Sequence, residues 1–186
     1  IGTSYQVPII QLLQNNPGLA GQFTLYPGQT LVISYQGEKV GTLTVNGYAY
    51  PFIERRLLEE TLPYLSSLTI FTYGFTMEGD LIGLEDQELI TLARRYGVAP
   101  FMSLSTWTEE GIFSNELAHV MLNDQEIQNR LIEQVLANLQ QKNYYGLDLD
   151  FEYILAEDRD AYTSFVKNIS ERLSMFGYPV TVAVAP

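Results

Sequence analysis

Three carboxylic acids recur at every second position around residue 150. Asp148, Asp150 and Glu152 alternate there with apolar side chains, which are Leu147, Leu149 and Phe151. Because successive side chains of an extended strand point to opposite faces, we expect the acids on one face and the apolar residues on the other. Neighbouring carboxylates repel one another and burial disfavours their charge, so such a row raises the pKa of one of its members. The row can therefore supply a proton donor for general acid catalysis.

Two other interpretations of the acid row stay open. A half-exposed surface strand can carry three acids, although such strands more often carry Thr, Ser or Lys. The row could also bind Ca²⁺ or Mg²⁺, which prefer oxygen ligands. Carboxylates along a straight strand lack the turn that wraps oxygens around an ion, so we predict no metal and no other cofactor.

The acid row also resembles the signature of glycoside hydrolase family 18, which reads D-x-x-D-x-D-x-E. Residues 145–152 match its last three acids and the glycine that follows its first position, here Gly146. Tyr145 replaces the first Asp, whose role in the family is mainly structural. The resemblance implies a (β/α)8 TIM barrel and a retaining mechanism in which the substrate's own 2-acetamido group is the nucleophile.

The same resemblance implies a distinct role for each acid. Glu152 would be the general acid that protonates the glycosidic oxygen. Asp150 would orient the acetamido group and stabilise the oxazolinium intermediate, and Asp148 would lie behind Asp150 and share a proton with it.

Aromatic residues that could stack on sugar rings lie at the ends of predicted strands and in one loop. The predicted substrate-binding residues are Tyr48, Tyr50, Phe75 and Tyr153 at carboxyl ends of strands, and Trp107 in a long connection. Each of them also fits a role in the core or as a loop anchor, and that alternative stays open. The single histidine, His119, lies far from the acids in sequence and forms no recognisable triad, so we predict a structural role for it.

From residue 43 onward, short β-rich runs alternate with helical runs of ten or more residues. The predicted strands are residues 44–50, 68–73, 98–103, 144–154 and 179–185; the predicted helices are 54–65, 85–96, 124–141 and 157–176; residues 76–84 and 104–123 are predicted connections. This alternation is typical of an α/β fold with a parallel sheet. With the resemblance, it predicts that residues 44–186 are the first five units of a TIM barrel, which usually takes about 250 residues. Such a half-barrel would leave its first and last strands as unpaired edges, so we expect a fragment of a longer protein; an independently stable five-stranded open sheet is the alternative.

Residues 1–34 form a different, turn-rich unit. They contain a predicted short helix at 8–13, a turn at 25–29 and a strand at 30–33. The sequences N-P-x-L at 16–19 and L-x-P-G-Q-x-L-x-I at 25–33 resemble most of a lysin motif (LysM). The first strand and opening turn of that motif are missing here. The resemblance implies a partial LysM module that binds N-acetylglucosamine polymers, followed by a linker at 35–43; an unrelated connecting segment is the alternative.

Composition and charge exclude several classes of partner. The 186 residues carry a net charge of −12 and have a pI of about 4.3, so a basic patch for nucleic acid or an anionic membrane is not expected. There is no cysteine, which excludes disulfides and thiolate metal sites. No apolar run approaches the about 20 residues of a membrane span. No export signal is visible, and we expect the amino terminus to be truncated.

The order of LysM-like unit, linker and barrel, with Glu157, Asp158 and Arg159 after the acid row, resembles spore-associated N-acetylglucosaminidases of endospore-forming bacteria. This resemblance implies a glycosidase that acts on peptidoglycan or a chitin-like polymer and is located at the spore or cell wall. Two alternatives stay open: a lectin-like binding protein and a structural protein of the spore coat. The presence of Glu152 favours the enzyme, because lectin-like members of the family have lost that acid.

Overall fold

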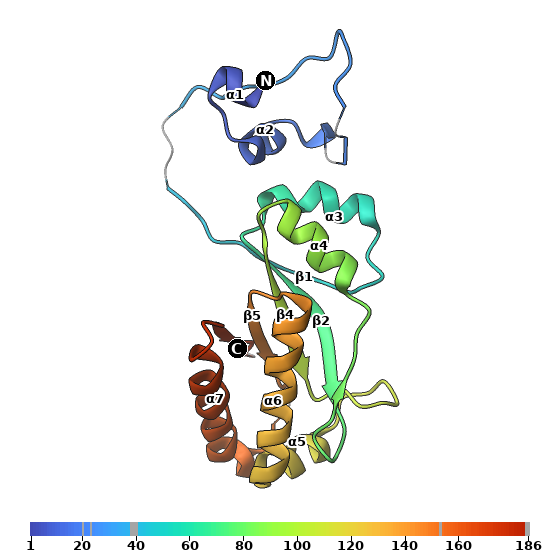
Figure 1. The fold of residues 1–186 in the computed structure, drawn as a ribbon, viewed down its shortest axis with the longest axis vertical. Helices are drawn as coiled ribbons and strands as arrows, with labels where there is room; N and C mark the ends of the chain where they lie inside the picture. Colours follow the sequence, from blue (N-terminus) through green and yellow to red (C-terminus); the bar gives the residue numbers. More distant parts are fainter. Residues whose placement is uncertain (20, 23, 38–40, 153, 185–186) are drawn as a thin grey trace.

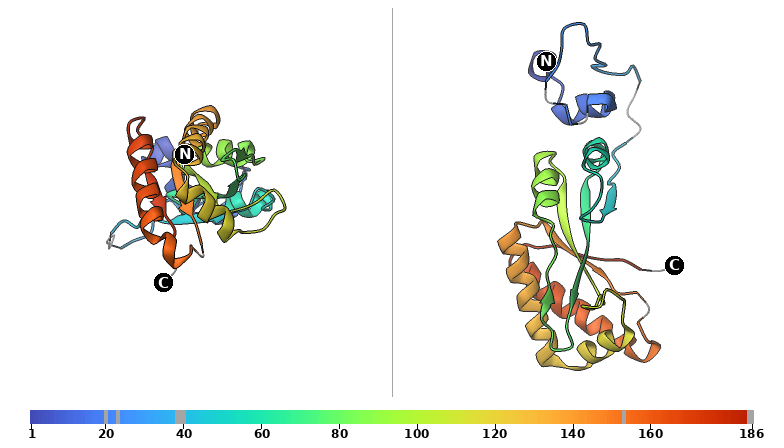
Figure 2. Two further views of the ribbon diagram at one scale, coloured as in Figure 1. Left: turned by 90° about the horizontal axis from the view of Figure 1, so that it is seen from below. Right: turned by 90° about the vertical axis from the view of Figure 1, so that its right-hand side faces the viewer.

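The computed structural model describes residues 1–19, 21–22, 24–37, 41–152 and 154–184. A small helical unit at the amino terminus precedes a sheet that is surrounded by helices (Figure 1). Viewed from the end of the molecule, the helices form an arc around the strands (Figure 2). None of the helices in these ranges is long and apolar enough to cross a membrane.

The main sheet consists of parallel strands in the order β1-β2-β4-β5-β6. These strands are β1 (Asn46–Ala49), β2 (Ser67–Phe75), β4 (Ala99–Ser105), β5 (Gly146–Asp150) and β6 (Val180–Val182). The connections between them carry α3 (Arg55–Thr61) with η2 (Leu62–Tyr64), α4 (Gln87–Arg95), α5 (Asn115–Asn123), α6 (Gln125–Lys142), η3 (Ala156–Asp158) and α7 (Arg159–Ser174). The order of the strands and the helices between them confirm the predicted α/β fold of a partial TIM barrel.

The sheet is strongly curved, and one hydrogen bond demonstrates it. The hydroxyl of Tyr48 on β1 donates to Asp148 on β5 at 2.7 Å, although two strands lie between β1 and β5. Neighbouring strands are about 4.8 Å apart, so three steps across a flat sheet would cover about 14 Å. Both side chains therefore point to the inside of an arc of strands, which is the interior of a barrel.

The core lies between the convex side of this arc and the helices. Alternation along β5 buries Leu147 and Leu149 there. The helical spacing recognised in the sequence supplies the opposite surface, with α6 and α7 contributing the fully buried residues Leu131, Val135, Leu139, Phe165, Ile169 and Leu173. Asp124 caps α6 by accepting hydrogen bonds from the backbone of Glu126 and Ile127, which explains where that helix begins.

Two connections contain regular structure that the sequence analysis did not predict. Residues 76–84 include β3 (Leu81–Ile82), which pairs with the end of β2 in an antiparallel direction. Residues 104–123 include α5, whose first turn is capped by the side chain of Ser114, which accepts a hydrogen bond from Leu117 N at 3.1 Å. Ser114 at the cap and Glu116 in the first turn are the local signals that mark this helix.

The amino-terminal unit contains α1 (Gly2–Tyr5), α2 (Ile9–Asn15) and η1 (Pro17–Leu19). Helix α1 was not predicted, and the predicted strand at 30–33 is wrong because this segment has no strand partner in the described part of the chain. Its backbone is satisfied by a side chain instead. Asn16 accepts from Val32 N at 2.7 Å and donates to Val32 O at 2.8 Å.

This unit contacts the barrel segment through α2 and η2. Gln14 donates to Pro63 O at 2.6 Å, and the Tyr64 hydroxyl donates to Gln14 O at 3.1 Å. Since η2 directly precedes β2, these contacts lie at the amino ends of the strands, as Figure 1 also shows.

Candidate functional site

Strand β5 positions the acid row. Asp148 and Asp150 lie in the strand, and Glu152 follows its last residue at an exposed position. Phe151, between the last two acids, turns to the other side, where its ring stacks with those of Phe75, Tyr162 and Phe165 at centroid distances of 5.9, 5.7 and 5.8 Å. Packing of this ring anchors the chain directly beside Glu152.

Asp148 is a buried carboxylate held by two hydroxyl groups. Only 2% of the residue is exposed. Tyr48 on β1 donates to one carboxylate oxygen at 2.7 Å, and Thr181 on β6 donates to the other at 2.5 Å. Burial, the bond to Asp148 and the charges of Asp148 and Asp150 together raise the pKa of Tyr48 above its usual range, so this hydroxyl keeps its proton and remains a donor.

Asp150 is partly buried, and its proton affinity is increased. Burial is the largest cause of its raised pKa, followed by the negative charges of Glu152 and Asp148. The same acids act on Tyr162, whose pKa is raised to about 12, mainly by burial and then by Asp150 and Asp148. The row therefore concentrates negative charge at the carboxyl end of β5.

An aromatic cavity opens at the carboxyl ends of the neighbouring strands. It has a volume of about 810 Å³ and is lined mainly by rings, which are those of Tyr50, Phe52, Phe71, Trp107 and Phe113. Tyr50 and Phe52 are stacked at 5.0 Å with an angle of 16° between their planes, and Phe52 is 83% exposed. Trp107 packs edge-on against Phe113 at 4.9 Å. Flat, accessible rings of this kind can stack on the apolar face of a sugar.

The four predicted substrate-binding residues that the structure describes divide into three groups. Tyr50 and Trp107 line the aromatic cavity, whereas Tyr48 is directed at Asp148 and holds the acid row. Phe75 is fully buried and stacked on Phe151, so its ring offers no face to a ligand and it is a core residue. Tyr153 lies outside the described residues. The sequence analysis did not identify Phe52 or Thr181, although the aromatic pair at 50 and 52 directly after a predicted strand is a signal for Phe52.

A second cavity, of about 500 Å³, lies on the concave face of the sheet beside Asp148. Its lining is rich in hydroxyl and amide groups and includes Asn46, Tyr48, Thr69, Tyr145 and Thr181. Asn46 accepts hydrogen bonds from Ser67 at 2.9 Å and Thr69 at 3.3 Å. The interior of the arc is therefore polar around the acid row.

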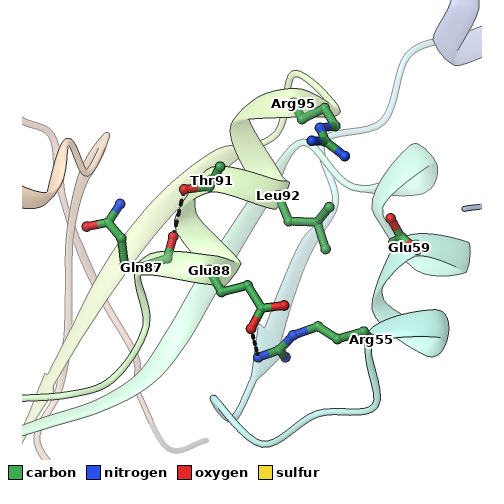
Figure 3. Close-up of a pocket in the computed structure, with 7 residues that line it drawn as sticks. All are labelled: Arg55, Glu59, Gln87, Glu88, Thr91, Leu92 and Arg95. Carbon is green, nitrogen blue, oxygen red and sulfur yellow. Dashed lines mark hydrogen bonds and ion pairs between the residues drawn. The ribbon is translucent and has the colours of Figure 1, made fainter.

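A third cavity, of about 460 Å³, lies between α3 and α4 and contains none of the predicted site residues (Figure 3). Arg55 spans it and forms an ion pair with Glu88 at 2.8 Å. Arg55 also donates to Ile53 O and Pro51 O, at 3.0 and 3.1 Å. These bonds fix the turn that carries Phe52. Arg55, which is drawn in Figure 3, therefore stabilises one wall of the aromatic cavity.

Within the described ranges, no group of three or more His, Cys, Asp or Glu residues is arranged to hold a metal ion. The chemistry available at the site is that of carboxylates, hydroxyls and aromatic rings. It can donate a proton, orient a polar group and hold a sugar.

Comparison with known proteins identifies the family of this chain. A sequence profile described as glycosyl hydrolases family 18 matches residues 44–186, and a LysM domain profile matches residues 1–34. YdhD of Bacillus subtilis (strain 168), whose name describes it as a candidate sporulation-specific glycosylase, is 30% identical over 179 residues, which are 96% of this chain and 42% of YdhD. A cortical fragment-lytic enzyme of Bacillus cereus is 32% identical over 124 residues, which are 67% of this chain and 29% of that enzyme.

A solved structure agrees with these matches. The spore cortex-lytic enzyme SleL of Bacillus cereus superposes with a TM-score of 0.69 and 27% identity, covering 100% of this chain and 44% of the SleL chain. The chain thus spans less than half the length of the relatives it matches.

Proposed function

Because this chain belongs to glycosyl hydrolases family 18, we propose that it carries the acid row of a glycosidase that cleaves N-acetylglucosamine linkages in peptidoglycan or a chitin-like polymer. The observation that supports this most is the geometry of β5. Asp148 is buried and doubly hydrogen-bonded, Asp150 has an increased proton affinity, and Glu152 is exposed beyond the end of the strand.

In this proposal Glu152 is the general acid. Its exposed position past the strand lets it reach a glycosidic oxygen bound at the mouth of the barrel, while the buried Phe151 fixes the backbone beside it. The substrate's 2-acetamido oxygen attacks the anomeric carbon with retention, so no second carboxylate serves as nucleophile.

Asp150 orients the acetamido group and stabilises the positive charge of the oxazolinium intermediate. Its raised pKa matches a group that holds a proton in one step and carries negative charge in another. Asp148 shares that proton. Tyr48 and Thr181 donate to Asp148 from the two edges of the described sheet and hold its carboxylate in place beside Asp150.

The aromatic cavity is the proposed sugar-binding surface next to the acids. Tyr50, Phe52 and Trp107 expose ring faces or edges there, and stacking on such rings tolerates polar groups around the sugar's edge. Phe52 joins the predicted residues Tyr50 and Trp107, and Phe75 leaves that set because it is buried.

We further propose the division into a LysM module at 1–34, a linker at 35–43 and a catalytic barrel segment at 44–186. The module binds the same class of N-acetylglucosamine polymer and increases its effective concentration at the barrel. The names of the relatives, a cortical fragment-lytic enzyme and a spore cortex-lytic enzyme, support peptidoglycan as the substrate and the spore or cell wall as the location.

The direct test is Glu152→Gln in the full-length protein. The amide keeps the size of the side chain but has no acid proton, so hydrolysis of N-acetylglucosamine oligomers should fall by about 10²–10⁴-fold while oligomer binding is retained. Matched glucose oligomers, which lack the acetamido group, should not be cleaved by the unaltered protein. Full activity of Glu152→Gln, or equal cleavage of the two sugars, would contradict the proposal. Oligomer binding without any hydrolysis by the unaltered protein would instead indicate a lectin-like protein.

A further inference from the structure

A cluster of polar side chains joins α5 to η3, outside the acid row. His119 Nδ1 lies 2.9 Å from each carboxylate oxygen of Asp158. Asn123, one turn further along α5, donates to Asp158 Oδ1 at 2.9 Å and to His119 O at 2.8 Å. Asp158 is only 1% exposed. A buried carboxylate is stable only with partners, and both of these partners come from α5.

The cluster fixes one end of the segment that carries Glu152. Asp158 follows Glu152 by six positions, and its backbone N–H donates to Leu155 O at 2.9 Å. The other end is fixed by Phe151 in the core, and Ile154 between them packs against that core. The segment is thus held at both ends, and release of Asp158 would leave Glu152 with only the anchors at Phe151 and Ile154.

The same helix is connected to the loop of Trp107. Ser114 caps α5, and its backbone N–H donates to Thr106 O at 3.0 Å, next to Trp107. Helix α5 therefore lies between the loop of the proposed sugar-binding tryptophan and the segment of the proposed acid.

We propose that His119 is a positioning residue: together with Asn123 it clamps Asp158, and thereby fixes the Glu152 segment relative to α5 and the Trp107 loop. His119 does not contact the substrate. The expected effect of His119 on turnover rests on the proposed function. The contacts of His119 and Asn123 with Asp158 do not depend on it.

Protonation should control the strength of the clamp. The charged groups that act on His119 are Asp158 and Glu157, both in η3, the latter at 3.9 Å. The hydrogen bond from His119 to Asp158 is the main cause that raises the pKa of His119, and the charge of Asp158 adds to it. Burial works to raise the pKa of Asp158, but the bonds from Asn123 and His119 outweigh it and lower that pKa.

The sign of the pH dependence follows from these two shifts. A raised histidine pKa gives stabilisation that is fully present below the unfolded value of about 6.5 and is lost as the pH rises through the folded value. A lowered Asp158 pKa gives stabilisation that is present above about 3.9 and is lost as the pH falls through the folded value. The clamp should be strongest where Asp158 is ionised and His119 is protonated. It should weaken as the pH rises through the raised pKa of His119.

The experiment compares His119→Ala, His119→Gln and the control Lys167→Gln, which removes an exposed ion pair at 3.8 Å on α7. In the full-length protein, His119→Ala should lower kcat on the order of 10- to 100-fold with KM within about threefold, because a misplacement of about 1 Å can cost about 10²-fold. His119→Gln can still donate to Asp158, so it should recover part of kcat but lose the alkaline fall of the pH profile. Lys167→Gln should behave as the unaltered protein.

A second measurement does not depend on activity. Trp107 is the only tryptophan of these 186 residues, and subtracting the spectrum of a Trp107→Phe variant of the full-length protein isolates its emission, which reports on its own loop. In the unaltered protein the emission should change with pH at the midpoint of the His119 titration followed by NMR, and both variants of His119 should lack this transition. An unchanged kcat and pH profile in His119→Ala would overturn the proposal. If His119→Ala does not fold, a flat Trp107 emission through the titration of His119 in the unaltered protein would overturn it equally. If the proposed function is wrong, Glu152→Gln will keep full activity. The fluorescence transition would still test whether His119 clamps Asp158.

Discussion

Two buried carboxylates in this chain are held in opposite ways. Asp86, just before α4, is fully buried and receives the ammonium group of Lys142 at 2.7 Å, the Tyr144 hydroxyl at 2.5 Å and the Tyr73 hydroxyl. Asp148 on β5 is equally buried, but in the part of the chain that the structure describes its donors are two hydroxyl groups. The first carboxylate is neutralised by a cation, and the second shares its surroundings with two more acids.

The surroundings of Asp86 suit a structural role, and those of Asp148 suit a role in proton transfer. Burial alone would lower the pKa of Lys142, but its bonds to Asp86 and Tyr73 outweigh burial and raise it, so Lys142 remains a cation. Lys142 also donates to Leu84 O at 2.6 Å, and the cluster joins α4, α6 and β2. Among the described residues no cation pairs with the acids of β5, and their negative charge increases the proton affinity of Asp150. A neutralised carboxylate holds the fold together, whereas an uncompensated one is available for proton transfer.

The largest effect on stability is expected where the cation is removed. Lys142→Ala leaves Asp86 buried without its counter-charge, which should lower the free energy of unfolding by about 3–5 kcal/mol. Lys167→Ala, which breaks an exposed ion pair with Glu171, should cost no more than about 1 kcal/mol. Chemical denaturation of both variants measures the difference, and equal losses would remove the distinction between the two carboxylates.

Asp150→Asn should have the opposite profile, with a large effect on activity and little on stability. Hydrolysis should fall by about 10²–10³-fold, as for the removal of one group that stabilises transition-state charge. A raised folded pKa means that Asp150 destabilises the fold at neutral pH and stabilises it relatively as the pH falls, so the amide should not weaken the fold at pH 7. The measurements are hydrolysis by the full-length variant and its denaturation midpoint at pH 5 and 7. A strongly destabilised but active variant would reverse the assignment.

Tyr48→Phe tests how the uncompensated carboxylate is tolerated. It leaves one buried oxygen of Asp148 without its donor, which should cost about 1–3 kcal/mol of stability. Tyr35→Phe, at an exposed position, serves as the control and should cost nothing measurable. No difference between the two variants in denaturation would mean that Thr181 alone satisfies Asp148.

The smallest effect is expected for Asp148→Asn. Hydroxyl groups both donate and accept, so Tyr48 and Thr181 can reorient to satisfy an amide, and no cation is left unpaired. The loss of stability should stay below about 1 kcal/mol, whereas Asp86→Asn should cost more, because it removes the counter-charge of the partly buried ammonium group of Lys142. Chemical denaturation of Asp148→Asn and Asp86→Asn compares the two carboxylates directly. A larger loss of unfolding free energy in Asp148→Asn would contradict the distinction between them.

The sequence predicted what local spacing controls. The period of two placed Asp148 and Asp150 on one face of a strand, and helical spacing identified the buried faces of α6 and α7. The predicted strand at 144–154 is too long, because β5 ends at Asp150 and Glu152 lies beyond it. Helix α5 was missed because its apolar stripe is short and the loop before it has no regular period, although Ser114 marks its start.

Contacts between distant residues could not be predicted from spacing. Tyr48 is 100 positions from Asp148, and Lys142 is 56 positions from Asp86. Such pairs are set by the curvature of the sheet and by the way helices pack on it, for which the sequence carries no local signal. The buried position of Phe75 has the same origin, because the ring of Phe151 covers it from another strand.

The contact between Gln14 and the residues just before β2 has a consequence for how a glycan network would be degraded. The amino-terminal unit lies at the amino ends of the strands, and the acid row lies at the carboxyl ends (Figure 1). Strand β2 alone has nine residues and spans about 30 Å, at about 3.3 Å per residue. If both regions bind glycan as proposed, the piece that is held and the piece that is cut are separate. The enzyme would then stay attached to one strand while it cleaves its neighbours, opening a mesh around an anchor point instead of following a single chain to its end.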